Sequence, residues 1–400
     1  MLQMVKKNNL YALDFGTTKF CIASLVYDRV AKSYALHTIS VPAQGMKRGM
    51  LSDINLARKA IVNLIEKCES QLSVDIKKVA IGIAGSHLDS YHVTKQYPLN
   101  GIEITKSFLN KIDSDIKSHP RKNRENLHTI PIAYKLDERN WIDNPLGMSA
   151  NCVTSKYLII DADRNYLKDI LMVCNHSGIE VSSLYSEPLA SASVTINDDQ
   201  KEIGTAIADI GGGTTDGIIF QFGKPTKLFT INIGGLMMTR DLAIGLNLPH
   251  KEAEKIKMFF GLNSSETAEI EVEDLQGNIK KINQSQVSRI LHPRIYELCS
   301  LIKEQIFQFS HNMASGILLT GGGSEVKNIN SVFNSNLKMN VATVQPSFDI
   351  NGENSVYANK FATVLGLLNL EFKKMQRKSH THIWNNQYFS QFVNWLKELS

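Results

Sequence analysis

The stretch Asp14-Phe15-Gly16-Thr17-Thr18-Lys19 decides the fold, because a stretch of the same kind occurs again 195 residues later, counted from Asp14 to Asp209. The second copy reads Asp209-Ile210-Gly211-Gly212-Gly213-Thr214-Thr215-Asp216. Short apolar runs flank both copies, which predicts a strand, a turn and a return strand in each half. The long period indicates an internal duplication of an α/β unit and not a solenoid repeat.

Both turns have a composition that suits phosphate binding. Glycine lets backbone N–H groups approach a phosphate closely, and threonine hydroxyls add donors. Neither turn is a GxxxxGK[ST] loop, and neither is a GxGxxG turn that opens a helix. The alternative is that each is only a tight β-hairpin, which is less favoured because the pattern repeats in a matching context.

Charged residues at the two turns suggest a metal and a phosphate tail. Asp14 and Asp209 are the first residues of the two turns. Two carboxylates that face one phosphate tail form a natural site for hydrated Mg²⁺, which keeps several of its waters. Lys19 supplies a point charge that could pair with a β- or γ-phosphate.

A third glycine run, Gly321-Gly322-Gly323 followed by Ser324, comes directly after the apolar stretch 317–320. A buried strand that ends in such a turn can pack against a nucleobase and its ribose. The alternative is an ordinary strand-to-helix connection.

The composition limits the classes of protein to consider. Of 400 residues, 43% are hydrophobic and 21% are charged, which fits more than one globular unit. A net charge of +5 is too small for the basic surface of a nucleic-acid binder. The five cysteines are scattered, with no CxxC pair, as in reduced cytoplasmic proteins. We find no apolar run long enough for a signal peptide or a transmembrane helix.

Two helices are predicted with some detail. Residues 52–70 have a helical pattern that Asp53 can cap, with Leu56, Ala60, Leu64 and Ile65 on one face. A long helix is predicted over 286–312, with a break or kink at Pro293. The polar residues 262–286 before it predict an irregular or β excursion.

The two hairpins and the glycine-rich turn, in this order, resemble the actin-like ATPase superfamily. Within it, further motifs are similar to those of the FtsA family of bacterial cell-division proteins. These motifs are Ile83-Ala84-Gly85-Ser86-His87, His128-Thr129-Ile130-Pro131 with Tyr134, Asn144-Pro145-Leu146-Gly147-Met148-Ser149, Glu187-Pro188-Leu189-Ala190-Ser191-Ala192, Ile233-Gly234-Gly235 with Thr239, 241–246, and Ala253-Glu254 with Ile256-Lys257 and Gly261. The resemblance runs from about Tyr11 to Leu368 and resumes at the C-terminal tail.

The resemblance implies an α/β fold of actin-like (ribonuclease H-like) duplicated domains around a nucleotide cleft, with an FtsA-type insertion and a C-terminal amphipathic helix. The expected parts are subdomain 1A over 1–84 and 165–202, inserted subdomain 1C over 85–164, subdomain 2A over 203–235 and 311–370, subdomain 2B over 236–310, a basic linker over 371–382, and a membrane-targeting helix over 383–400.

The resemblance also implies an ATP site with Mg²⁺ held through water by Asp14 and Asp209. The first phosphate turn would be Asp14, Gly16, Thr17, Thr18 and Lys19, the second Asp209, Gly211, Gly212, Gly213, Thr214 and Thr215, and the adenosine turn Gly321, Gly322, Gly323 and Ser324. Glu254 and Lys257, three residues apart on a helix, would reach the ribose and adenine; the alternative is a surface ion pair. Glu187 would lie near the attacking water; the alternative is a structural carboxylate at a Glu-Pro turn.

The C-terminal segment is predicted to be an amphipathic helix at the bilayer interface. At about 100° per residue, its apolar side chains share one face. They are Trp384, Tyr388, Phe389, Phe392, Trp395, Leu396 and Leu399. Aromatic side chains suit the interface, and the upstream basic residues Lys373, Lys374, Arg377 and Lys378 favour anionic headgroups. The alternative is a helix that docks on its own protein or on a partner.

The resemblance implies a peripheral protein at the cytoplasmic face of the membrane at the division site. Its expected partners are the C-terminal peptide of FtsZ, further copies of itself in an actin-like protofilament, anionic lipids, and later division proteins through subdomain 1C. Arg294 is a candidate for the FtsZ contact, although His292 stands where the family often has an acidic residue, and an ordinary surface arginine is the alternative. Hydrolysis of ATP would be slow or absent.

Three alternatives remain open at this point. A pilus-assembly protein of the PilM type shares the actin-like fold and the insertion, but is not expected to carry the terminal helix. A sugar kinase would need a further catalytic aspartate, and we cannot identify one in the sequence. A chaperone would need a substrate domain, and only about 30 residues follow the ATPase core.

Overall fold

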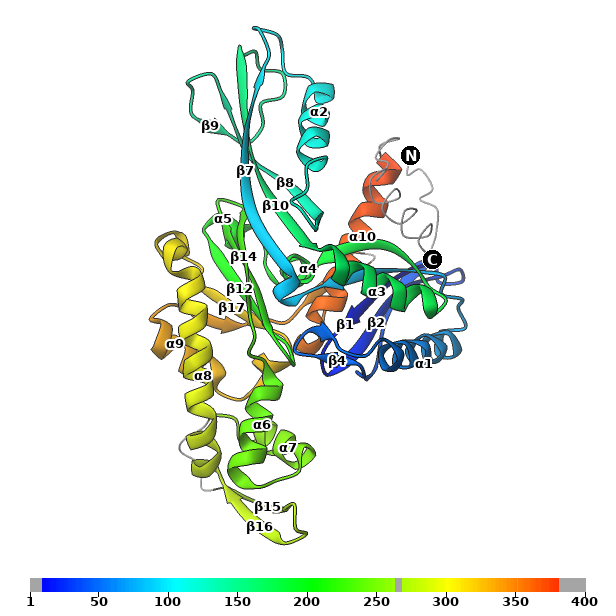
Figure 1. Cartoon of the computed structure of the whole chain (residues 1–400), viewed down its shortest axis with the longest axis vertical. Coiled ribbons are helices and arrows are strands. Elements are labelled where there is room, and N and C mark those ends of the chain that lie inside the picture. The colour runs from blue at the N-terminus through cyan, green and yellow to red at the C-terminus, as the bar shows by residue number, and fades with distance from the viewer. Residues whose placement is uncertain (1–8, 263–267, 351, 381–400) are drawn as a thin grey trace.

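The computed structural model describes residues 9–262, 268–350 and 352–380, and the side chains of the last segment up to Gln376. Two five-stranded sheets form its centre (Figure 1). In the first, the strand order is β11 (Glu180–Ser186), β6 (Lys78–Ile83), β1 (Leu10–Phe15), β2 (Lys19–Asp28), β3 (Ser33–Pro42). In the second, it is β18 (Val341–Thr343), β17 (Ile317–Thr320), β12 (Thr205–Ile210), β13 (Thr215–Gln221), β14 (Lys224–Ile231).

The two sheets share one topology, which confirms the predicted duplication. In each, three antiparallel strands are followed by two further strands, of which one pairs in parallel with the first strand and the other pairs in parallel with that added strand. The register matches residue for residue, because Asp14 pairs with Cys21 and Asp209 pairs with Asp216. The residue opposite the first aspartate therefore differs between the halves.

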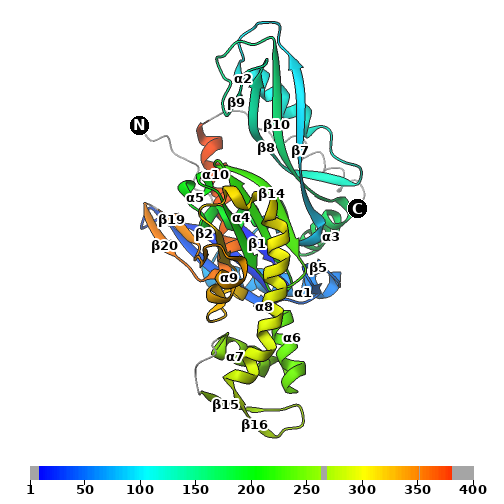
Figure 2. The same cartoon turned by 90° about the vertical axis from the view of Figure 1, so that its left-hand side faces the viewer.

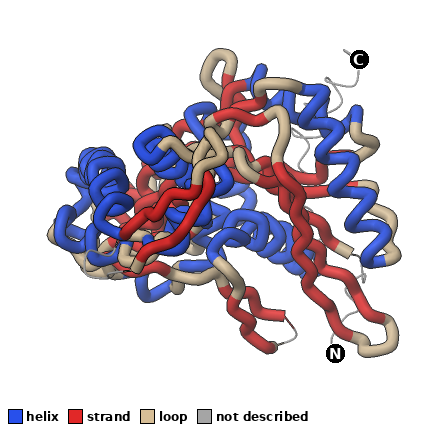
Figure 3. Tube along the Cα trace, turned by 90° about the horizontal axis from the view of Figure 1, so that it is seen from below, coloured by secondary structure: helices blue, strands red, loops and turns tan. Residues whose placement is uncertain are grey.

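Helices cover both sheets (Figure 3). Helices α1 (Ile54–Leu72) and α3 (Arg164–His176) pack on one face of the first sheet. Helices α4 (Glu187–Thr195) and α10 (Ala362–His380) pack together between the sheets. They approach closely because Gly366 has no side chain: a Cβ there would lie 2.0 Å from the carbonyl oxygen of Ala190.

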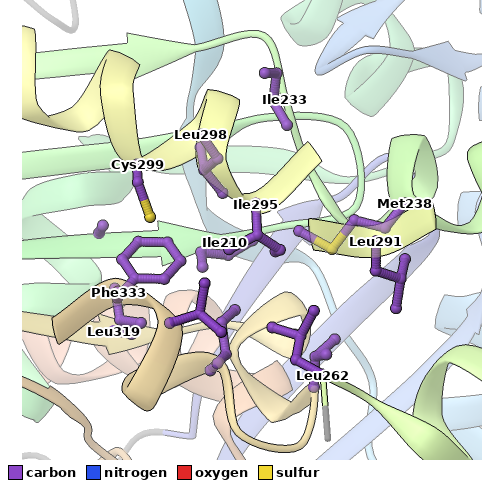
Figure 4. Packing of buried hydrophobic residues seen from close by; sticks show 14 of the residues in the cluster. Ile210, Ile233, Met238, Leu262, Leu291, Ile295, Leu298, Cys299, Leu319 and Phe333 are labelled. Atoms are coloured by element: carbon purple, nitrogen blue, oxygen red, sulfur yellow. The ribbon is translucent and has the colours of Figure 1, made fainter. Parts of the chain in front are cut away.

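The largest apolar core lies beside the second sheet. It joins strand residues such as Ile210 and Leu319 to α8 (Gln284–Ile306) and α9 (Ile329–Leu337) (Figure 4). Pro293 lies within α8 without ending it, and the helix tightens to the 3₁₀ turn η2 (Phe307–Asn312). The predicted long helix is thus an α-helix only as far as Ile306.

Two smaller units project from opposite ends of the long axis (Figure 2). One follows the 3₁₀ turn η1 (Gly85–His87) and holds β7 (Leu88–Pro98), α2 (Lys106–Lys117), β8 (Arg124–Leu136), β9 (Trp141–Ile142) and β10 (Cys152–Asp163). The other holds α6 (Gly235–Leu246), α7 (His250–Phe260) and the hairpin β15 (Glu269–Glu273) with β16 (Ile279–Asn283). The hairpin is the β excursion expected in that region.

The remaining elements are short. They are the hairpin β4 (Met46–Lys47) with β5 (Met50–Leu51), α5 (Asp198–Glu202), η3 (Gly322–Glu325), β19 (Ser347–Ile350) with β20 (Glu353–Val356), and η4 (Asn359–Phe361).

Two local predictions need correction. In α1, the Asp53 side chain caps the helix by accepting the N–H of Leu56, but the Leu56 side chain is 43% exposed and Ala57 takes its place in the core. The segment expected as a linker from 371 continues α10 to His380, because Phe372 still packs against Tyr34 and Glu371 accepts a 2.8 Å hydrogen bond from Tyr185.

The predicted amphipathic helix lies outside the described residues. Within the part of the chain that is described, no helix combines the length and the apolar character needed to cross a membrane.

Candidate functional site

A cavity of about 990 Å³ lies between the two halves, where their strand–turn–strand units face one another. It brings together nearly all of the side chains and turns predicted for the site. Its lining includes Asp14, Gly16, Thr17, Thr18, Lys19, Glu187, Asp209, Gly211, Gly212, Gly213, Thr214, Glu254, Lys257, Gly321, Gly322 and Gly323. The two turns touch: a Cβ on Gly212 would lie 2.4 Å from Cγ2 of Thr18. Glycine at this position is what allows the close approach.

Two predicted residues are not part of the lining. Thr215 is fully buried, and its hydroxyl donates a 2.7 Å hydrogen bond to the carbonyl of Ile233. Ser324 is also buried; its hydroxyl donates to the carbonyl of Gly321 at 2.8 Å and accepts from the Asn359 amide at 3.0 Å. Both hydroxyls hold the turns in shape and do not face the cavity.

The two threonines of the turns have opposite hydrogen-bonding roles. Thr17 Oγ1 accepts the backbone N–H of Gly49 at 2.9 Å, so its own hydrogen remains available to a phosphate oxygen. Thr214 Oγ1 donates to Oδ2 of Asp216 at 2.6 Å, so toward the cavity it can only accept. The expectation that every threonine hydroxyl of the turns adds a donor is therefore wrong for Thr214.

Four carboxylates line the cavity: Asp14, Asp209 and Asp216 are buried, and Glu187 is half-buried. Burial, only partly offset by Lys19, raises the pKa of Asp14 to about 7. Burial, Asp14 and the two other aspartates raise the pKa of Glu187 well above its usual range. Burial also raises the pKa of Asp209 and Asp216, although hydrogen bonds to each carboxylate act against it.

This charge arrangement fits a divalent cation. Carboxylates crowded into a low-dielectric cavity repel one another, and a bound cation relieves that repulsion. Within the described residues, no group of three or more metal-ligating side chains is close enough to hold an ion by itself. The positions of Asp14 and Asp209 on the cavity wall are compatible with Mg²⁺ bound mainly through its own waters, and this metal site stays a prediction.

The wall of the cavity formed by α7 holds an ion pair whose lysine is more buried than in a surface pair. Lys257 is 3% exposed, and its Nζ donates to Glu254 at 2.7 Å, to Thr239 at 3.0 Å and to the carbonyl of Gly235 at 3.2 Å. Both charged side chains line the cavity and lie on α7. The ammonium is thus fixed by three oxygens at the cavity wall.

Two predicted cations have protein partners in this structure. The Nζ of Lys19 donates to the carbonyl of Lys360 and lies 4.7 Å from the centre of the Phe361 ring. Arg294 binds Asp241 through Nε at 2.7 Å and Nη2 at 3.2 Å, and it also pairs with Glu297. Its side chain is 20% exposed, as in the alternative of an arginine that stabilises its own surface.

The sequence analysis missed several residues that line the cavity, among them Asp216, Tyr166 and Thr363. Asp216 follows the second turn, and only the register of β12 with β13 shows that it lies opposite Asp209. Tyr166 and Thr363 reach the cavity from α3 and α10, far away in sequence. Thr363 carried no local signal, and comparison of the return strands gives no match for Asp216, because Cys21 stands at the equivalent place.

Comparison with known proteins assigns the family. The family model for the cell division protein FtsA matches residues 206–366, and the model for the SHS2 domain inserted in FtsA matches residues 85–161. Together the two segments make up more than half of the chain. The chain belongs to the FtsA family of cell-division proteins.

Full-length relatives agree with this assignment. The FtsA of Buchnera aphidicola subsp. Baizongia pistaciae is 26% identical over 424 residues, which cover 100% of both chains. The FtsA of Escherichia coli K12 is 27% identical over 347 residues, which cover 82% of each chain. The matched SHS2 segment corresponds to the unit built of η1, β7, α2, β8, β9 and β10, which we call the inserted domain.

Solved structures show the same actin-like fold. MreB5 of Spiroplasma citri bound to ADP has a TM-score of 0.56 at 15% identity, over 94% of this chain and 99% of that one. A chain of the PilM–PilN type IV pilus biogenesis complex has a TM-score of 0.61 at 15% identity, over 91% of this chain and 98% of that one. These likenesses confirm the predicted fold class of this FtsA-family chain.

Proposed function

We propose that this FtsA-family chain binds ATP with Mg²⁺ in the central cavity and tethers FtsZ filaments to the inner face of the cytoplasmic membrane at the division site. The observation that carries the nucleotide site is the meeting of two phosphate-type turns and the Gly321–Gly323 turn around one cavity. The MreB5 structures bound to ADP and to AMPPNP support a nucleotide in this fold.

Different turns would bind different parts of the nucleotide. Gly16 to Lys19 and Gly211 to Thr214 would hold the phosphates, and Gly321 to Gly323 with Glu254 and Lys257 would hold the adenosine. A bound Mg²⁺ would neutralise charge between the carboxylates and the phosphate tail. Lys19 would exchange the Lys360 carbonyl for a phosphate oxygen.

ATP hydrolysis would be weak. Glu187 lines the cavity and would position the attacking water together with Thr214, whose hydroxyl oxygen accepts toward the cavity. The raised pKa of Glu187 favours its protonated form in the nucleotide-free cavity, and a protonated carboxyl is a poor proton acceptor. Nucleotide would therefore act mainly as a conformational ligand that biases self-assembly into protofilaments.

Membrane attachment would come from the aromatic segment after residue 383. This segment lies outside the described residues, and the proposal rests on its sequence pattern and on family membership. Later division proteins would bind the inserted domain. The basic residues that precede the segment would add attraction to anionic lipids, each worth up to about 1 kcal/mol.

Flotation with anionic liposomes in MgATP tests the tether. The full chain should float, and a chain ending at His380 should not; ending there spares the part of α10 that packs on the body. Trp395→Glu should detach the protein, whereas Asn394→Glu, the same charge at a residue outside the predicted apolar face, should not. Equal flotation of both variants would contradict the membrane helix.

Binding to two peptides tests whether FtsZ is the partner. The full chain should bind the C-terminal peptide of FtsZ and should not bind an N-terminal peptide of a pilus protein. The reverse result would favour the pilus-assembly alternative. The Arg294 contact predicts that Arg294→Glu weakens FtsZ-peptide binding, while Arg289→Glu, on the same helix, serves as its control.

A further inference from the structure

The first residue of the inserted domain is bonded to the wall of the nucleotide cavity. Gly85 is buried and has a φ of +77°, a conformation that favours glycine. Its backbone N–H donates a 3.1 Å hydrogen bond to Oδ1 of Asp216, a residue 131 positions later that lines the cavity. The entry to the inserted domain is thus fixed by a side chain of the second half.

The same carboxylate also holds the second phosphate turn. Oδ2 of Asp216 accepts the hydroxyl of Thr214 at 2.6 Å, and Oδ1 accepts the hydroxyl of Thr230 at 2.7 Å. Three donors from three places in the chain therefore converge on one buried group. A ligand that displaces the Asp216 carboxylate must change the bond that holds Gly85.

The hydroxyl of Thr230 can form either of two hydrogen bonds where the inserted domain meets the cavity wall. Its hydroxyl has one hydrogen and lies within reach of two acceptors, Oδ1 of Asp216 at 2.7 Å and the carbonyl of Gly85 at 3.3 Å. Rotation about one side-chain bond transfers the hydrogen bond from the cavity wall to the inserted domain. The described lining of the cavity does not include Thr230, so it acts through Asp216.

The inserted domain has a second attachment on the same strand, β14. Ser90 Oγ accepts the backbone N–H of Leu228 at 2.9 Å, and Nε2 of His92 lies 3.0 Å from the carbonyl of Thr226. Leu158 and Leu228 belong to one apolar cluster shared by the inserted domain and the second half. A change in the hydrogen bond of Thr230 therefore acts on a domain that already contacts the same strand.

We propose that Thr230 is a positioning residue that couples occupancy of the nucleotide cavity to the attachment of the inserted domain. When the Mg²⁺ of bound MgATP attracts the carboxylate of Asp216, Thr230 turns to the Gly85 carbonyl, and the hydrogen bonds that fix residues 85–92 change. Because coupling between two binding sites is reciprocal, a ligand of the inserted domain then changes the affinity for ATP by the same factor. This inference rests on the proposed binding of ATP.

Hydrogen exchange in the full chain, with and without MgATP, tests the coupling. In the wild type, MgATP should change exchange at residues 85–92 by about threefold or more. Thr230→Val, which keeps the shape and removes the hydroxyl, should abolish that change while ATP affinity stays within about threefold. Thr230→Ser, which restores the hydroxyl, should restore the response. Thr226→Val is the matched control, because its hydroxyl contacts neither Gly85 nor Asp216.

Several results of this experiment would overturn the proposed coupling. A full MgATP response in Thr230→Val overturns the coupling, as does a wild type that binds ATP without any change at residues 85–92; both leave the proposed ATP site intact. A loss of affinity beyond about tenfold in Thr230→Val would place Thr230 in nucleotide binding instead and also overturn it. A wild type that binds no ATP would overturn the inference and the proposed function together.

Discussion

Oδ2 of Asp209, the first residue of the second glycine-rich turn, accepts a 3.0 Å hydrogen bond from the hydroxyl of Thr363 in the first turn of α10. The same oxygen accepts the hydroxyl of Ser191 at 2.6 Å. The two hydroxyls come from α10 and α4, the helices that pack between the sheets. The position where Mg²⁺ and the phosphate tail are expected is thus tied to the helices that separate the halves.

Asp209→Asn should lose ATP binding and yet stabilise the nucleotide-free protein. Burial raises the pKa of Asp209, so its ionised form is disfavoured in the fold, and an amide removes that cost while it can still accept from Ser191 and Thr363. We expect Tm without nucleotide to rise by about 2 °C and the Tm increase on adding MgATP to disappear. The exposed Asp349→Asn is the control. Wild-type affinity in Asp209→Asn would contradict the assigned site.

Asp14 should make the nucleotide-free protein less stable as pH rises. Burial raises its pKa from 3.8 to about 7, so between these values the folded state keeps a proton that the unfolded state has lost. The free energy of unfolding therefore falls with pH across this window, and the contribution present below 3.8 is lost above about 7. Asp14→Asn should flatten this part of the curve.

The measurement for Asp14 is Tm without nucleotide from about pH 4 to about pH 8, taken as the difference between wild type and Asp14→Asn. The difference removes the contributions of other groups that titrate in the same range. An identical pH dependence in both proteins would show that the Asp14 carboxyl is not held protonated by its surroundings.

His128 should make the protein less stable as pH falls, whereas Asp14 should make it less stable as pH rises. Its side chain is half-buried, its Nε2 accepts the backbone N–H of Ser186 at 2.9 Å, and desolvation lowers its pKa from 6.5 to about 4. Between these values the unfolded state binds a proton that the folded state does not bind. The free energy of unfolding therefore rises with pH from about 4 to 6.5 and falls when the pH is lowered through that range.

Two substitutions separate the hydrogen bond of His128 from its titration. His128→Leu leaves the Ser186 N–H without an acceptor and should cost about 2 kcal/mol in urea unfolding near neutral pH. His128→Gln keeps an acceptor, should cost less, and should flatten the acid limb. The exposed His119→Gln should leave both unchanged. Acid sensitivity that survives in His128→Gln would show that another group causes it.

The fold and most of the site could be predicted because their signals are local. The two Asp–Gly–Thr turns and their matching flanks show the duplication directly, and Glu254 and Lys257 meet because they lie three residues apart on α7. Each of these inferences needs only spacing within one element or repetition of one pattern.

The rest depended on register and on distant packing. Thr214 and Thr215 are neighbours of the same type, and only the twist of the chain into β13 shows that one lines the cavity and the other bonds Ile233. Asp216 needs the pairing of β13 with β12, and Thr363 needs the docking of α10. These positions depend on contacts between elements and cannot be read from the residues of one segment.

The ion pair of Glu254 and Lys257 should matter more for stability than its spacing alone suggests. Lys257 is 3% exposed, so Glu254→Ala leaves a buried ammonium with only Thr239 and the Gly235 carbonyl. Because Glu254 itself is half exposed, we expect a loss of about 2 kcal/mol in urea unfolding, below the 3–5 kcal/mol that is typical of a fully buried pair.

Glu252→Ala on the same helix is the matched control for this pair. It breaks the exposed pair with Lys255, whose atoms lie 2.6 Å apart, and should cost about 0.5 kcal/mol or less. Adding Lys257→Met to Glu254→Ala should recover part of the lost stability, because it removes the unpaired charge. ATP affinity should fall in both Glu254 variants and stay unchanged in Glu252→Ala. Equal losses of stability in Glu254→Ala and Glu252→Ala would show that burial of Lys257 does not strengthen the pair.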